Sequence, residues 1–76
     1  MIKEHDRVVL TTSVPKECLV AGDVGTVVHV YQDAQAYEVE FVALDGHTTA
    51  VTTLETRQIR PVTAQDMTHT REIQAV

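Results

Sequence analysis

Apolar and polar residues alternate strictly over residues 37–41, where Tyr37, Val39 and Phe41 are separated by Glu38 and Glu40. Because successive side chains of a β-strand point to opposite faces of the sheet, this period of two predicts a strand with one dry and one solvated face. The three apolar side chains are expected in a core, and both glutamates are expected on the surface.

Four further segments have the composition of strands: residues 6–11, 24–31, 48–53 and 58–62. The first three are rich in β-branched residues, and the last is short and contains Pro61, which suits the edge or the end of a strand. An Asp45-Gly46 pair lies between the strands expected over residues 37–41 and 48–53 and is a typical hairpin turn. The chain therefore predicts five short strands, with the last one pairing with the first.

The strand expected over residues 24–31 follows a Gly22-Asp23 turn and is almost continuously β-branched. Strict alternation along it predicts one face with Val24, Thr26, Val28 and Val30 and an opposite face with Val27, His29 and Tyr31. The chain has two tyrosines, one phenylalanine and no tryptophan, so Tyr37 is expected in the core. The position of Tyr31 stays open at this level.

Five short strands with one tight hairpin favour an all-β fold, a small five-stranded SH3-like barrel formed by residues 1–62. In the loop of residues 12–19, Val14 and Leu19 are expected to close one end of the barrel. Residues 63–76 form a polar C-terminal tail. A frayed end is the default expectation for this tail, and the alternative is a helix that begins after Thr63 and docks on the barrel or on a second subunit.

A chain of 76 residues forms one domain, and a domain of this size buries only about 60% of its unfolded surface. Self-association would add to such a small core, and there is no room for a deep catalytic cleft. The single Cys18 excludes an internal disulfide. We find neither the apolar core of a signal peptide nor a span of roughly 20 apolar residues, and therefore expect a cytoplasmic protein.

Enzymatic chemistry has little support in the residue pattern. The histidines are too far apart in sequence to match metal-ligand spacing: His5, His29, His47 and His69. Ser13 is the sole serine and has no recognisable triad partners. The two glutamates of residues 37–41 are expected on a solvated face, where nothing raises a carboxyl pKa for acid–base catalysis. We predict a non-enzymatic protein without a metal or another cofactor.

The formal net charge of −5 argues against a surface for phosphate groups. Glu38 and Glu40 instead predict an acidic face that attracts a protein partner, and Tyr31 is a third candidate contact residue. The alternative is a nucleic-acid surface, for which the two ends of the chain would have to meet. Its candidate residues are Arg7, Arg57 and Arg60.

Four segments of the chain resemble the domain-of-unknown-function 4926 family of short bacterial proteins. They are Asp6-Arg7-Val8-Val9-Leu10-Thr11, Gly22-Asp23-Val24-Gly25-Thr26-Val27-Val28, Tyr37-Glu38-Val39-Glu40-Phe41 and Arg60-Pro61-Val62. The resemblance implies an SH3-like barrel and a bacterial origin, and it supplies no catalytic residue. Some members lie beside genes for small toxin-like proteins, which implies an antitoxin or immunity partner.

Gly25-Thr26-Val27 is also distantly similar to the KOW-type barrels of ribosomal and transcription proteins, which implies RNA binding as the alternative function. Such barrels carry basic residues around this motif. Here the surroundings provide Asp23, His29 and Asp33, which do not attract a phosphate backbone. A protein partner therefore remains the favoured prediction.

Overall fold

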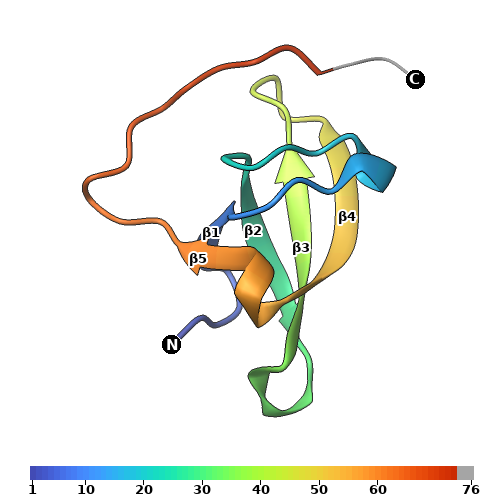
Figure 1. The fold of residues 1–76 in the computed structure, drawn as a ribbon, viewed down its shortest axis with the longest axis vertical. Coiled ribbons are helices and arrows are strands. Elements are labelled where there is room, and N and C mark those ends of the chain that lie inside the picture. Colours follow the sequence, from blue (N-terminus) through green and yellow to red (C-terminus); the bar gives the residue numbers. More distant parts are fainter. Residues whose placement is uncertain (74–76) are drawn as a thin grey trace.

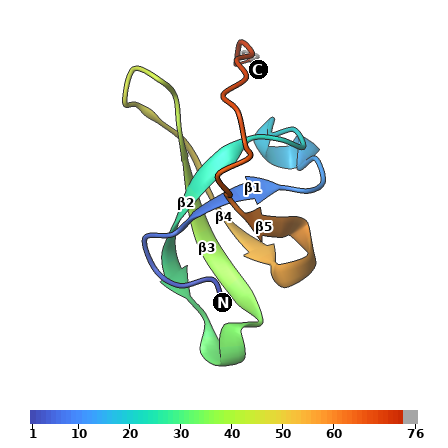
Figure 2. The ribbon, with the colours of Figure 1, turned by 90° about the vertical axis from the view of Figure 1, so that its left-hand side faces the viewer.

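The computed structural model describes residues 1–73, and within them five strands form one antiparallel sheet (Figure 1). The strands are β1 (Arg7–Leu10), β2 (Val24–Val30), β3 (Ala36–Val42), β4 (Thr48–Glu55) and β5 (Ile59–Pro61). Their order across the sheet is β4-β3-β2-β1-β5, so that β5 returns to pair with β1. The prediction of an all-β fold with five strands is confirmed, and the curled sheet in Figure 2 is consistent with a small barrel.

Alternation along β3 determines which face of the sheet becomes the core. Tyr37, Val39 and Phe41 are buried as predicted, whereas Glu38 and Glu40 are half-buried on the opposite face. The other strands contribute further buried side chains to the same core: Val8, Leu10, Val27, Ala50, Leu54 and Ile59. Each fully buried side chain of this size stabilises the fold by about 1.5–3 kcal/mol, so this cluster is the main source of stability.

The loop before β2 closes one end of the core. Val14 and Leu19 form an isolated antiparallel bridge across the short 3-10 helix η1 (Pro15–Glu17). Leu19 is buried, and Val14 packs against the core while remaining partly exposed. Both residues contact the core, as their expected role requires.

A β-bulge interrupts β2, and the prediction of strict alternation over residues 24–31 is wrong there. Val27 lies opposite Val39, but His29 lies opposite Glu38. Val28 is therefore an additional residue with no counterpart on β3. Such an insertion bends the strand and exchanges the faces to which the following side chains point.

The exchange places Val30 on the inner face, opposite the buried Tyr37, where Val30 packs against the core. It places His29 on the outer face of the sheet, opposite Glu38. Tyr31 follows one residue beyond Val30 and is also on the outer side. The bulge thus decides the question that the sequence left open for Tyr31.

The three remaining connections are short. Gly46 adopts a positive φ of 95° in the predicted Asp45-Gly46 hairpin turn, which is confirmed. The 3-10 helix η2 (Gln32–Ala34) joins β2 to β3 without a glycine, although Asp33 and Ala34 both have positive φ. The 3-10 helix η3 (Thr56–Gln58) leads from β4 into β5.

Residues 62–73 run outside the sheet, and we call this segment the strap. It leaves β5 and arches along one side of the barrel in Figure 1, and it rises past β1 in Figure 2. No helix forms within residues 63–73, so the helical alternative for this part of the tail is wrong. The side chain of Asp66 instead accepts the backbone N–H of Thr63 at 2.7 Å and closes a turn. Residues 74–76 of the predicted tail lie outside the described residues.

None of the helical segments within residues 1–73 has the length and apolar character needed to cross a bilayer.

Candidate functional site

The outward-facing side chains of β2, β3 and β4 form a surface that we call the acidic face. Its centre is β3, because Glu38 and Glu40 project from this middle strand. Glu38 lies between His29 of β2 and Thr53 of β4, and Glu40 lies between Thr26 and Val51. Both carboxylates therefore stand in a setting of mostly neutral polar and apolar side chains.

Glu38 holds Tyr31 on this face. The Tyr31 hydroxyl donates to Glu38 Oε1 over 2.6 Å, and the Thr53 hydroxyl donates to the same oxygen over 3.3 Å. The hydrogen bond to this carboxylate raises the pKa of the Tyr31 phenol above its ordinary value, because loss of the proton would place two negative charges together. The structure therefore brings together two of the three predicted contact residues directly.

Glu40 is held by a threonine of β4. Its Oε2 accepts a hydrogen bond from the Thr48 hydroxyl at 2.6 Å. Among the described residues, nothing donates to the second oxygen of either glutamate. The Cα atoms of the two glutamates are roughly 7 Å apart along the strand, since the residues are two positions apart. Each carboxylate is thus fixed in place and keeps one acceptor oxygen for an external donor.

The rim of the acidic face contains residues that sequence reasoning missed. The ring of His29 stands edge-on to that of Tyr31, with 4.6 Å between the ring centroids, and His29 Nδ1 is 3.8 Å from a Glu4 carboxylate oxygen. Val28 and Val51 are more than 40% exposed. A period of two residues places His29 on the inner face of the sheet, whereas it lies on the outer face. The sequence alone does not show the bulge at Val28 that causes this difference.

The three arginines of the alternative nucleic-acid surface do not form one free basic patch. Arg57 Nε is 2.8 Å from Glu55, and Arg60 is 2.8 Å from Asp66. Arg7 shares a face with Arg60, because Arg60 lies opposite Val9 of β1, whereas Arg57 belongs to η3 at the other end of β1. Two of the three positive charges are therefore neutralised by carboxylates of the same chain.

Two shallow hollows are each lined in part by Arg57. One is lined by Gln35, Glu55, Thr56 and Arg57, and the other by Thr12, Ser13, Arg57 and Gln58. Neither hollow includes Glu38, Glu40 or Tyr31. Within residues 1–73, no three His, Cys, Asp or Glu side chains gather in the way that a metal site requires.

These features define a small all-β domain with an acidic face on its three-stranded half. The chain matches the model of the family described as Domain of unknown function (DUF4926) over residues 4–61 and belongs to this family. The matched segment covers all five strands. Neither the curated proteins nor the solved structures gave a match.

Proposed function

We propose that this domain is a non-enzymatic module that binds a basic protein through the acidic face. The observation that carries the proposal is the pair of fixed carboxylates on β3, each with one oxygen still able to accept a hydrogen bond. Their positions are set by hydroxyl groups of the same sheet, so little side-chain freedom is lost when a ligand binds. Fixed acceptors on a rigid sheet suit recognition of a partner surface.

The spacing of the two glutamates indicates what the partner presents. Two cations about 7 Å apart match alternate side chains of an extended segment, since these are separated by the same two-residue repeat. The exposed valines Val28 and Val51 provide apolar contact area beside the charges. The overall charge of −5 would also accelerate the approach of a basic protein. A small basic toxin-like protein, neutralised by this domain as by an antitoxin or immunity protein, fits that description.

The experiment is affinity capture from a bacterial lysate with the tagged full chain and with the variant E38K/E40K. The matched control is E17K/E72K, which changes the net charge equally at positions away from the acidic face. Circular dichroism verifies that both variants keep the β-sheet spectrum. We expect a stoichiometric basic protein that is captured by the wild-type chain and the control variant and is lost with E38K/E40K.

Equal capture by both double variants would contradict a role for the acidic face. A parallel capture after nuclease treatment tests the alternative, since partners that disappear with the nucleic acid would indicate binding through RNA. In that case the affinity for RNA should fall steeply with salt, as phosphate contacts require.

A further inference from the structure

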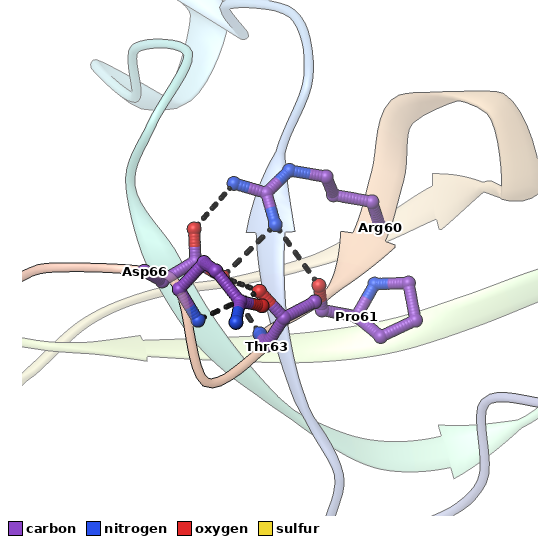
Figure 3. A network of polar contacts seen from close by, with 5 residues as sticks. Arg60, Pro61, Thr63 and Asp66 are labelled. Atoms are coloured by element: carbon purple, nitrogen blue, oxygen red, sulfur yellow. Dashed lines mark hydrogen bonds and ion pairs between the residues drawn. The ribbon is translucent and has the colours of Figure 1, made fainter.

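The strap is fastened at its beginning by one arginine–aspartate pair (Figure 3). Arg60 Nη1 and Nη2 donate to the two carboxylate oxygens of Asp66 over 3.0 and 2.8 Å. Arg60 Nη1 also donates to the carbonyl oxygen of Pro61 over 3.0 Å. The chain is thereby held against the end of β5 as far as Asp66.

A second pair fastens the far end of the strap to the barrel. Arg71 Nε donates to Asp23 Oδ1 over 2.9 Å, and Arg71 Nη2 donates to Asp23 Oδ2 over 2.6 Å. The same Nη2 donates to the carbonyl oxygen of Cys18 over 3.1 Å. The side chains of Asp23 and Arg71 are only 17% and 29% exposed, so this pair is better shielded from water than a usual surface ion pair.

The acceptors of this pair are built by the barrel. Asp23 Oδ2 also accepts the backbone N–H of Val20 over 3.0 Å, and the backbone N–H of Asp23 donates to the carbonyl of Val20. Gly22 takes a φ of 99° and donates its N–H to the carbonyl of Leu10 in β1. Cys18 itself has a left-handed φ of 60°. The carboxylate and the carbonyl therefore keep their positions through contacts that do not involve Arg71.

The segment that matches the family model includes Cys18 and Asp23 but ends before Arg71. We propose that the turn of residues 18–23 is a guanidinium-binding site of the domain, filled in the free protein by the chain's own Arg71. In the complex, an arginine of an extended segment of a partner protein takes the place of Arg71 and displaces the strap. The site does not include any residue of the acidic face, but its external ligand belongs to a partner already bound at another surface of the domain, so this part of the inference rests on the proposed function.

The geometry favours a partner over a second copy of this chain as the external ligand. Because the Arg60–Asp66 pair holds the strap at Asp66, only residues 67–70 separate this fixed point from Arg71. A tether of this length gives Arg71 an effective concentration in the millimolar range. The same arginine on another free copy cannot compete at micromolar concentration. A partner that is already bound elsewhere on the domain has a high local concentration of its own.

The test uses the full chain carrying Arg71→Gln, which leaves the acceptors in place and removes their internal ligand. The probe is a capped peptide with the sequence of residues 67–73. Its binding is monitored through the backbone amide NMR signals of Val20, Gly22 and Asp23. We expect saturable shifts of these signals in the Arg71→Gln chain. In the wild-type chain, we expect that at least about tenfold more peptide is needed for the same shift, because the tethered arginine competes.

The matched control is the same peptide with glutamine in place of its arginine, added to the same Arg71→Gln chain. The proposal is overturned if that peptide shifts the three signals equally, or if the arginine peptide leaves them unchanged. A second comparison adds Asp23→Asn to the Arg71→Gln chain. Loss of the shifts there supports the site, and unchanged binding of the arginine peptide contradicts it.

Discussion

The barrel and the strap are held in place by different interactions. Every buried hydrophobic residue of the described chain lies between Val8 and Ile59, whereas all residues of the strap are exposed. The strap depends on two arginine–aspartate pairs, each at the surface or close to it. Apolar burial is the dominant stabilising contribution to folding, while surface ion pairs contribute about 0–1 kcal/mol and are screened by salt, and even the better shielded Asp23–Arg71 pair is partly exposed. We therefore expect the strap to detach under conditions in which the barrel stays folded.

The largest expected effect comes from truncating the barrel core at Leu54→Ala. Leu54 is 1% exposed, and its removal leaves a cavity among packed side chains, so the free energy of unfolding should fall by about 3 kcal/mol. The matched control is Leu44→Ala in the β3–β4 hairpin, where Leu44 is 89% exposed and a change below about 0.5 kcal/mol is expected. Urea denaturation measures both, and similar losses would contradict the assignment of the core.

A somewhat smaller effect is expected for Gly25→Ala in β2. A Cβ atom at this position would lie 2.6 Å from Val39 Cγ1 and 3.0 Å from the carbonyl oxygen of Glu40. The strands must shift to accommodate this Cβ atom, so the free energy of unfolding should fall by about 2 kcal/mol. In Gly46→Ala, a Cβ meets nothing within 4 Å, and the positive φ alone should cost about 1 kcal/mol. Equal or reversed losses in urea denaturation would refute the close approach of β2 and β3.

Acid should release the strap from the barrel. Burial raises the pKa of Asp23, but the hydrogen bonds from Arg71 and from the Val20 amide outweigh it and bring this pKa below its ordinary value of 3.8. A lowered pKa in the folded state means that the stabilisation is fully present above pH 3.8 and is lost as the pH falls through the folded-state value. The Nε–H signal of Arg71, which donates to Asp23, should therefore change with a midpoint below pH 3.8. A transition near neutral pH would contradict the pair.

The two ends of the strap should respond to acid in order. The Arg60 guanidinium and the Thr63 amide hold the pKa of Asp66 far below its usual range, so the beginning of the strap should stay fastened to lower pH than the end. The amide signal of Thr63 reports on the first pair and serves as the internal comparison in the same titration. Simultaneous release of both ends would indicate that the strap detaches as one unit.

The smallest effect concerns the acidic face and should be independent of the strap. Glu38→Gln weakens the hydrogen bond to the Tyr31 phenol and removes the neighbouring charge, both of which raise the pKa of this phenol, so this pKa should fall toward its ordinary value of 10.0. The protonated phenol is the form favoured by folding, and the stabilisation it provides is present below pH 10.0 and lost as the pH rises through the folded-state pKa. Titration of the ring carbon NMR signal of Tyr31 measures the shift. Arg71→Gln is the control that should leave it unchanged.

Local patterns predicted much of the barrel. The alternation of Tyr37, Val39 and Phe41 determined the buried face of β3, and the Asp45-Gly46 pair determined the turn that follows. Both features depend on residues that are neighbours in the sequence, where side-chain periodicity and turn chemistry act directly. The outward position of the two glutamates follows from the same period.

The remaining features depend on contacts that are distant in sequence. Arg71 and Asp23 are 48 residues apart, and nothing in the composition of either segment pairs them. The bulge at Val28 could not be predicted from a run of β-branched residues, since valine suits regular and bulged strands alike. The hydroxyl donors on the acidic face, Thr48 and Thr53, became identifiable only once the register of β3 and β4 was known.

The extra residue at Val28 shifts the alternation of inward and outward side chains along β2 by one position. Side chains before Val28 alternate in one phase and side chains after it in the other, so Thr26 and His29 both lie on the outer face while Val30 packs against the core. The side-chain spacing of a regular extended segment can match only one half of β2 at a time. In the binding proposed above, an extended partner segment would have to follow this offset to contact both halves of β2.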